Sequence, residues 1–214
     1  TLGLAIKLYN EVEIEVLRHV GPIIVEVEGE GADTLPRDAS NEVARGALQV
    51  LGQEGLGPQV ILRTLNRIPL ARGLGSSAAA RLGGLMAAWA IRADDPGLKD
   101  PVLLDWAAGL EGHPDNAAAA LYGGLCLSSF DGTQARVYPL GVPKDLAAVV
   151  CVPDFGLSTE KSRAALPKRV AFADAVKSVS RVAFLVAALK DGRMDWLRDA
   201  MVDVLHQPHR ARLV

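Results

Sequence analysis

Several residue types and patterns are scarce in this sequence of 214 residues, and each absence excludes a class of protein. Lys and Arg number 23 against 25 Asp and Glu, and neither sign forms a long run, so nucleic acid is not an expected partner. No apolar stretch approaches the ~18 residues of a membrane-spanning helix, and no secretory signal pattern opens the chain. We therefore expect a cytoplasmic protein without a membrane partner.

Cysteines and aromatic residues are also few. Cys126 and Cys151 lie in apolar runs, which favours two buried free thiols over a disulfide. Aromatic residues make up only 5% of the chain and hydrophobic residues 50%, so small aliphatic side chains must form the core. This composition is typical of a globular protein, and the length allows one large domain or two small ones.

The hydrophobic pattern predicts strands and helices in mixed order. Alternating apolar and acidic positions predict strands over 8–17 and 23–28, and Asp131-Gly132 predicts a hairpin. Ser40 or Asn41 is suited to cap a helix over 42–51, and Asn116 one over 117–122. The fold class that follows is α+β, because the elements do not alternate strictly as strand and helix. The other expected elements are strands over 60–66, 125–130, 135–140 and 147–152, and helices over 77–91, 102–111, 159–166, 169–190 and 193–204.

The segment PLARGLGSSAAA, residues 69–80, has the chemistry of a phosphate-binding loop. Gly73 and Gly75 permit backbone turns that other residues avoid, and Ser76 and Ser77 precede a helix whose first N–H groups attract anions. Arg72 adds a positive charge, and a serine hydroxyl is a suitable ligand for Mg²⁺. The loop therefore predicts a site for a phosphorylated ligand.

Two other interpretations of this loop remain. It is compatible with an ordinary connector that has a capping serine. It also matches G-x-G-x-x-A of dinucleotide-binding folds, with Asp94 or Asp95 about 20 residues further on. The context argues against a dinucleotide, because those aspartates lie in a turn and the preceding segment is polar. The chain lacks G-K-[ST], so the phosphate loop is not of the Walker type.

A second polar cluster, Glu111-Gly112-His113-Pro114-Asp115-Asn116, interrupts an apolar region. A plain connector would need only a helix stop and a cap. A closed zinc site would need more ligands than this loop holds. A carboxylate for Mg²⁺, with the remaining polar groups facing a small hydrophilic substrate, fits these residues better.

Together these segments resemble the GHMP kinases, a superfamily of small-molecule kinases. PLARGLGSSAAA is similar to their second motif, P-x-x-x-G-L-G-S-S-A-A, and EGHPDNAAAALYGG is similar to the corresponding block of the homoserine kinases. The segments 157–167 and 203–210 (DVLHQPHR) resemble later segments of the same kinases. Ala118 and Ala119 stand where the family often has Ala-Pro.

The resemblance implies an ATP- and Mg²⁺-dependent transfer of phosphate to the hydroxyl of L-homoserine, a step of threonine biosynthesis. It implies that Ser77 and Glu111 hold Mg²⁺, that Asp115 and Asn116 orient the hydroxyl, and that His113, Asp115, Asn116, Arg163 and Arg210 bind homoserine. Arg163 and Arg210 would grip its carboxylate, a task suited to arginine. His206 and His209 are interpreted as loop packing. The residues implied to surround ATP are Pro69, Arg72, Gly73, Leu74, Gly75, Ser76, Ser77 and Ala78.

The resemblance also implies a two-domain fold. Residues 1–142 would form the ATP-binding domain, like domain 2 of ribosomal protein S5, and 143–214 part of a ferredoxin-like domain. The family's first and third motifs are absent, so we expect the chain to be a fragment, weakly active or inactive by itself. A kinase for mevalonate or a sugar, and an inactive binding protein of the same fold, remain as alternatives, and a homodimer remains open.

Overall fold

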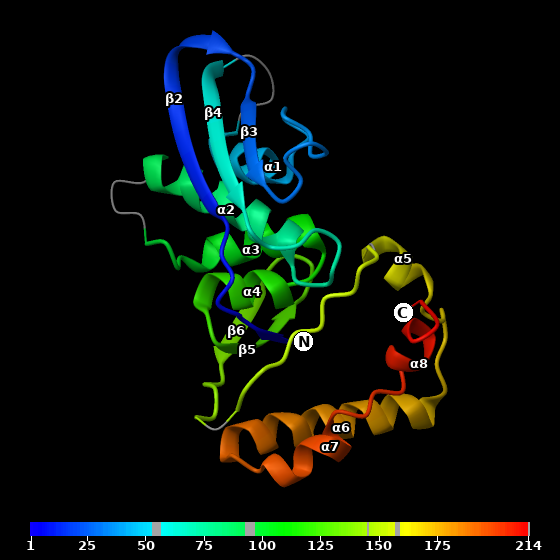
Figure 1. Ribbon diagram of the computed structural model, residues 1–214. Helices are drawn as coiled ribbons and strands as arrows, with labels where there is room; N and C mark the ends of the chain where they lie inside the picture. The colour runs from blue at the N-terminus through cyan, green and yellow to red at the C-terminus, as the bar shows by residue number, and fades with distance from the viewer. Residues whose placement is uncertain (53–56, 93–96, 145, 157–158, 214) are drawn as a thin grey trace. The chain divides into compact units, whose positions relative to one another are not determined.

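The computed structural model describes residues 1–52, 57–92, 97–144, 146–156 and 159–213 (Figure 1). They form two compact units. The first contains residues 1–70 and 74–139, and the second contains residues 71–73 and 140–214.

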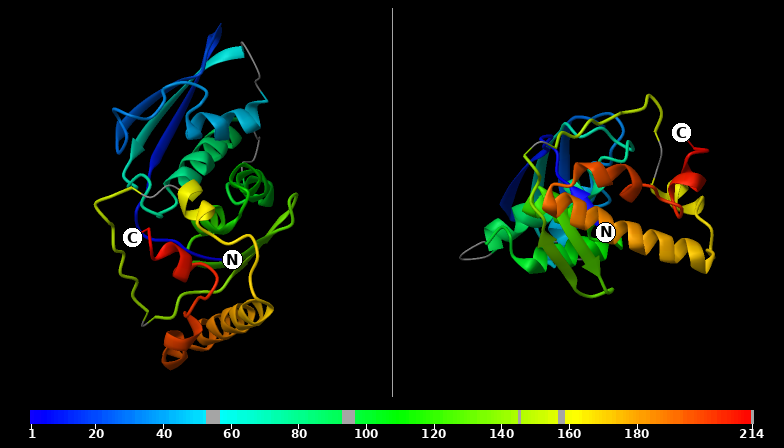
Figure 2. Two further views of the ribbon diagram at one scale, coloured as in Figure 1. Left: turned by 90° about the vertical axis from the view of Figure 1, so that its right-hand side faces the viewer. Right: turned by 90° about the horizontal axis from the view of Figure 1, so that it is seen from below.

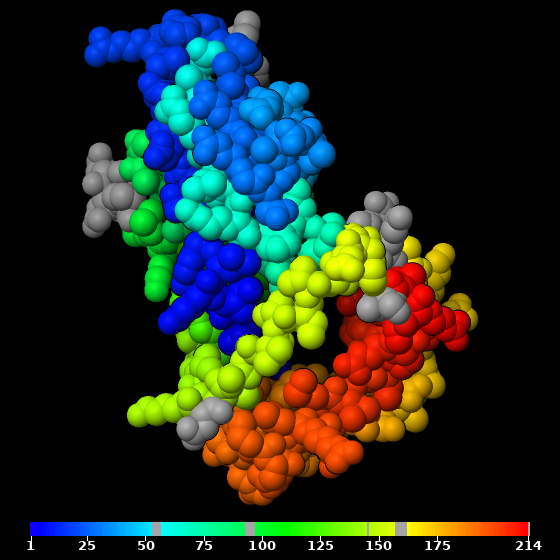
Figure 3. All heavy atoms as spheres, in the orientation of Figure 1, coloured from blue at the N-terminus to red at the C-terminus, as the bar shows by residue number. Residues whose placement is uncertain are grey.

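One sheet of the first unit has the strand order β2-β4-β3. Strand β2 (Glu11–Gly21) pairs antiparallel with β4 (Gly57–Asn66), and β3 (Ile24–Gly29) pairs parallel with it. The predicted alternation is confirmed over the first half of β2, residues 11–15, where the glutamates at 11, 13 and 15 are exposed and the apolar residues between them are half-buried. Figure 3 shows β2 along the edge of this sheet, beside β4.

Helix α1 (Glu42–Leu51) and helix α2 (Ser76–Arg92) pack against each other beside this sheet (Figure 2). Asn41 is the N-cap of α1, since its Oδ1 accepts a hydrogen bond from the N–H of Val43 at 2.9 Å. Two glycines let the helices approach closely. Gly46 lies against the carbonyl of Arg81, and Gly84 lies against that of Val43, so neither position has room for a Cβ.

A second sheet has the order β1-β5-β6 and is antiparallel throughout. Its strands are β1 (Leu2–Leu4), β5 (Leu125–Phe130) and β6 (Ala135–Pro139), and the last two form the predicted hairpin at Asp131-Gly132. Helices α2, α3 (Pro101–Glu111) and α4 (Asp115–Tyr122) lie between the two sheets (Figure 1). The core consists of small aliphatic residues as expected, among them Leu62, Leu82, Leu85, Leu103 and Leu104.

Two expectations for the first unit were wrong in detail. Asn116 does not cap α4, because the helix begins at Asp115 and the N-cap position is Pro114, which makes no side-chain cap bond. The expected alternation of burial ends at Val16, which is 46% exposed although it is still paired with Val60, and the pairing of β2 with β4 then shifts register between Val16 and Val20. Neither the first residue of α4 nor the register of β2 depends on local sequence alone.

The second unit contains helices, and its described residues include no strand. The strand predicted over 147–152 is absent, because this extended segment has no partner strand and Val149 is 89% exposed. Cys151 is exposed, contrary to the prediction of a buried thiol, whereas Cys126 is buried as expected. The helices are α5 (Thr159–Ala164), α6 (Phe172–Asp191), the 3₁₀ turn η1 (Met194–Trp196), α7 (Leu197–Ala200) and α8 (Gln207–Arg210).

The helix predicted over 193–204 is shorter than expected. Helix α7 ends at Ala200, and the carboxylate of Asp203 accepts hydrogen bonds from the backbone N–H groups of residues 205, 206 and 207. These bonds offer the backbone an alternative to a continuous helix and lead into α8. Among the described residues, no helix is long and apolar enough to cross a membrane.

Candidate active site

The glycine-serine loop connects β4 to α2. Gly73 and Gly75 have φ angles of 73° and 72°, in the left-handed region that favours glycine. Helix α2 begins at Ser76, whose hydroxyl donates to the carbonyl of Ile68 at 3.4 Å. The first turn of an α-helix has N–H groups without an intrahelical acceptor, so residues 76–78 offer donors to an anion beside Gly75.

Gly75 lies directly against Asn116, the second residue of α4. A Cβ placed on Gly75 would lie 3.2 Å from Cγ and 3.3 Å from Oδ1 of Asn116. Only a residue without a side chain leaves this space for the amide. The contact places the beginning of α4 beside the proposed phosphate loop.

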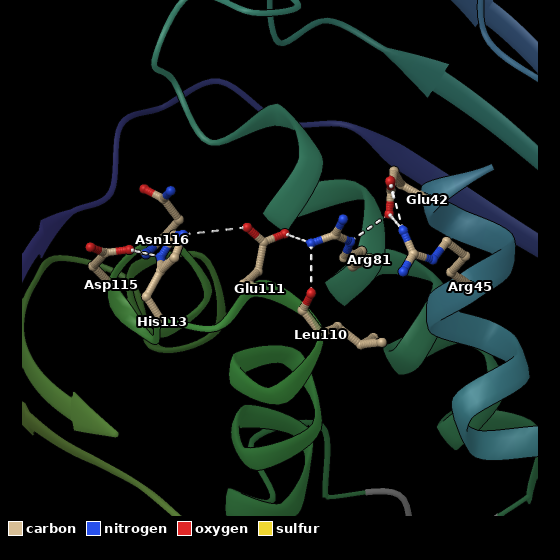
Figure 4. A network of polar contacts seen from close by, with 8 residues as sticks. All are labelled: Glu42, Arg45, Arg81, Leu110, Glu111, His113, Asp115 and Asn116. Atoms are coloured by element: carbon tan, nitrogen blue, oxygen red, sulfur yellow. Dashed lines mark hydrogen bonds and ion pairs between the residues drawn. The ribbon is translucent and has the colours of Figure 1, made fainter. Parts of the chain in front are cut away.

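The end of α3 and the beginning of α4 bring three titratable side chains together (Figure 4). Gly112 terminates α3 with a φ angle of 76° and turns the chain toward His113. The Nδ1–H of His113 donates to Oδ1 of Asp115 at 2.6 Å, and His113 Nε2 lies 3.8 Å from Oε2 of Glu111. The side chain of Glu111 is only 7% exposed, so this carboxylate needs a compensating charge.

Arg81 provides this charge, although no motif in the sequence predicts a role for it. Its Nη1 donates to Oε1 of Glu111 and, at 3.1 Å, to the carbonyl of Leu110, and its Nε donates to Oε2 of Glu42 (Figure 4). The signal in the sequence is an arginine between Ala80 and Leu82, in a run of residues 78–91 that is otherwise apolar. A charge in that position requires a partner from another element.

The pKa values of this cluster follow from burial and from the opposite charges. Burial alone would raise the pKa of Glu42, but the hydrogen bond and charge of Arg81, together with the charge of Arg45, lower it. Burial alone would lower the pKa of Arg81, but the hydrogen bond that it donates to Glu42 and the charge of Glu111 raise it. Both groups are therefore charged at neutral pH.

A cavity of about 600 Å³ lies next to the loop, lined by residues of the segment 4–12, the loop and helices α2 and α4. Gly75 and Asn116 belong to its wall, and so does Asn10. Oδ1 of Asn10 accepts hydrogen bonds from the N–H groups of Arg67 at 2.9 Å and Ile68 at 3.1 Å, whereas its buried Nδ2 has no partner. A buried donor without an acceptor is costly, so the cavity offers a donor to a polar ligand.

Pro69 lies in the first unit, whereas the predicted residues Arg72, Arg163 and Arg210 lie in the second. Arg72 donates to the carbonyl of Asp154 at 3.1 Å. Arg163 is exposed in α5, and Arg210 of α8 donates to the carbonyl of Ser162 at 3.3 Å, which brings α5 and α8 together. His206 lies 3.3 Å from Asp203. No group of three or more His, Cys, Asp or Glu among the described residues is arranged to hold a metal ion.

A dinucleotide-binding fold requires a second strand parallel to the one before the loop, and the described residues do not form it. Helix α2 is followed by helix α3 and not by a strand parallel to β4, as far as the described residues extend. Asp94 and Asp95 lie outside those residues, as do 157 and 158 of the segment 157–167. The dinucleotide interpretation is therefore not supported, and the loop alone is what this chain can share with other phosphate-binding proteins.

Comparison with protein families identifies the class. The model of the "GHMP kinases N terminal domain" matches residues 41–124, which include the glycine-serine loop, Arg81 and the block 111–116. The homoserine kinase of Symbiobacterium thermophilum is 44% identical over 222 residues, which cover 100% of this chain and 68% of that protein. The homoserine kinase of Moorella thermoacetica is also 44% identical, over 100% of this chain and 71% of the relative. This chain belongs to the homoserine kinase family of the GHMP kinases.

Solved structures agree with this assignment. The crystal structure of homoserine kinase from Cytophaga hutchinsonii superimposes with a TM-score of 0.78 at 28% identity, over 96% of this chain and 66% of that one. Phosphomevalonate kinase from Streptococcus pneumoniae shares the fold, with a TM-score of 0.61 at 16% identity over 91% of this chain and 67% of its own. The chain thus spans about two thirds of the length of its relatives, and the expected GHMP kinase fold is confirmed.

Proposed function

We propose that the protein is a homoserine kinase, which transfers the γ-phosphoryl group of ATP to the side-chain hydroxyl of L-homoserine. The reaction gives ADP and O-phospho-L-homoserine, an intermediate of threonine biosynthesis. The observation that supports it most directly is the contact of Gly75 with Asn116, in a chain whose relatives are homoserine kinases. Phosphoryl transfer depends mainly on positioning, and this contact joins the proposed donor and acceptor sides.

The glycine-serine loop is our proposed nucleotide site. Its left-handed glycines let the backbone N–H groups at the start of α2 point toward the phosphates. Arg72 would add a positive charge to this side. The proposed nucleotide contacts are Pro69, Arg72, Gly73, Leu74, Gly75, Ser76, Ser77 and Ala78.

Ser77 and Glu111 are the residues we propose to hold Mg²⁺. Hydroxyl and carboxylate oxygens are the donors that this ion prefers, and it commonly takes phosphate oxygens as further ligands. Oε1 of Glu111 is bonded to Arg81, whereas Oε2 is held only at 3.8 Å from His113, so one oxygen is available to the ion. When bound, Mg²⁺ neutralises negative charge on the phosphates during transfer.

The acceptor side begins at the block 111–116. We propose that Asn116 and Asp115 orient the hydroxyl, whose oxygen attacks the γ-phosphorus while the bond to the bridging oxygen of ADP breaks and the hydroxyl proton is released. His113 holds Asp115 through its 2.6 Å hydrogen bond. Arg163 and Arg210 would bind the homoserine carboxylate, supported by the bond of Arg210 to Ser162, the neighbour of Arg163.

The division into an ATP-binding domain, residues 1–142, and a second domain, residues 143–214, stays a proposal. The cytoplasmic location and a homodimer also stay predictions. Because the chain spans 68–71% of its curated relatives, we propose that a protein of their full length carries the activity.

A coupled assay of ADP release tests the proposal. The full-length protein is supplied with ATP, Mg²⁺ and homoserine, mevalonate or galactose in turn. We expect homoserine to give the highest kcat/KM. A preference for another alcohol, or ADP release that no acceptor stimulates, would contradict the proposed function.

A matched pair of variants assigns the activity to this site. Asn116→Ala removes the amide beside Gly75, and we expect kcat to fall about 100-fold, the effect of a misplaced reacting group. Gln134→Ala removes a similar amide from the exposed β5–β6 turn, where it only accepts a hydrogen bond from Arg136. Gln134→Ala should retain the full kcat.

A further inference from the structure

Arg81 joins three helices through one guanidinium group. Nε donates to Glu42 of α1, and Nη1 donates to Glu111 at the end of α3 and to the carbonyl of Leu110 (Figure 4). The side chain of Arg81 is 13% exposed and that of Glu111 is 7% exposed. The ion pair between Arg81 and Glu111 is therefore largely buried, so its strength and geometry depend on the surrounding protein and not on solvent.

The guanidinium fixes which oxygen of Glu111 is available. Arginine is planar, and its donors form a rigid fork, so a carboxylate bonded to it takes a defined direction. Oε1 of Glu111 is directed toward Arg81, and Oε2 is directed toward His113, on the side where Asn116 lies (Figure 4). Asn116 in turn contacts Gly75 of the proposed phosphate loop.

Charge within the group also matters. One guanidinium is shared by two carboxylates, Glu42 and Glu111, so the three side chains together keep one negative charge. Without Glu42, the charge of Arg81 would offset that of Glu111 and reduce its attraction for a cation. Arg45 also contacts Glu42, at 3.2 Å, but its side chain is 46% exposed, so solvent weakens its influence.

We propose that Arg81 is a positioning residue for Glu111, which holds the carboxylate through Oε1 so that Oε2 is presented to the Mg²⁺ of the bound nucleotide. Glu42 anchors Arg81 and offsets part of its charge. This inference rests on the proposed function, because it requires that Glu111 is a Mg²⁺ ligand. Residues that orient a metal ligand commonly change metal affinity about 10- to 100-fold when they are replaced.

The test measures how strongly Mg²⁺ and ADP support each other's binding. Isothermal titration calorimetry of the full-length protein gives the Kd of ADP in EDTA and in saturating Mg²⁺, and the ratio of the two is the coupling. Arg81→Lys keeps the charge but loses the fork, and we expect the coupling to fall about tenfold. Its Kd for ADP in EDTA should remain unchanged.

Glu42→Gln removes the anchor and one negative charge, and should reduce the coupling in the same direction. Arg45→Ala is the matched control, because Arg45 touches the same carboxylate from the solvent side. It should leave the coupling unchanged. Circular dichroism shows whether each variant is folded. If Arg81→Lys does not fold, the coupling measured for Glu42→Gln decides the test.

The outcomes separate the inference from the proposed function. If folded Arg81→Lys or Glu42→Gln has a lower melting temperature but the coupling of the wild type, Arg81 is only structural and the inference is wrong. If the wild type itself shows neither Mg²⁺-strengthened ADP binding nor homoserine-dependent ADP release, the proposed function fails. In the remaining case, lost coupling with an unchanged KM for homoserine supports Arg81 as the positioning residue.

Discussion

Gly75→Ala tests whether the phosphate loop and α4 act together. Two costs follow from the structure. The φ angle of 72° lies in the left-handed region, where an L-residue costs about 1–2 kcal/mol. The added Cβ would also lie 3.2 Å from Cγ of Asn116, closer than an ordinary contact, so the amide must move by a few tenths of an ångström.

The second cost should appear in catalysis. Misplacement by about 1 Å costs about 100-fold in rate, so a smaller displacement of Asn116 should reduce kcat with homoserine about tenfold. The loss in unfolding free energy, about 1–2 kcal/mol, should be visible as a lower melting temperature. The assays are steady-state ADP release and thermal unfolding.

Two glycines of similar φ angle separate these effects. Gly52, at the end of α1, has a φ angle of 63°, and Gly73 has one of 73°; a Cβ at either would meet nothing within 4 Å. Gly52→Ala should lose stability only. Gly73→Ala should lose stability and raise the KM for ATP, with kcat retained. If Gly75→Ala has the same kcat as Gly52→Ala, the contact with Asn116 has no role in transfer and the reasoning is refuted.

Three further predictions concern the rest of the molecule. Gly84→Ala should destabilise the protein by about 3 kcal/mol in chemical denaturation because a Cβ overlaps the backbone of α1, whereas Gly109→Ala, exposed in α3 with open space around it, should stabilise it by about 0.5–1 kcal/mol. Hydrogen bonds from the backbone of Gln134 and from Thr133 lower the pKa of Asp131 from 3.8 to about 2, so its stabilising effect should be present above pH ~4 and be lost as the pH falls toward 2. A carboxylate titration by NMR checks this, and a midpoint near 3.8 would contradict it. Cys151 should react quickly with a thiol reagent in the native protein, whereas Cys126, whose pKa is raised by burial, should react only after unfolding.

The sequence predicted elements whose signals are local. Helix α1 begins after a residue able to cap it, the Asp131-Gly132 pair produces a hairpin, and α2 begins one residue before the predicted start at 77. The alternatives Ser40 and Asn41 were resolved only by the structure, where Asn41 bonds to Val43 while Ser40 bonds to Asp38. Capping depends on which side chain the backbone turn directs inward.

What the sequence did not predict depends on distant contacts. The strand expected over 147–152 has suitable residues but no partner in the described part of the chain, and a strand requires one. Arg81 was overlooked because its partners, Glu42 and Glu111, are 39 and 30 residues away along the chain. Even the contact of Gly75 with Asn116 becomes evident only when α2 and α4 are packed together.

Phosphorus NMR of the reaction mixture tests the central claim most directly. The full-length protein is incubated with ATP, Mg²⁺ and L-homoserine, and the spectrum is followed with time. We predict a phosphate monoester signal that grows in proportion to ADP and is absent without homoserine. Formation of ADP with inorganic phosphate alone, or the absence of any ester, would contradict the account.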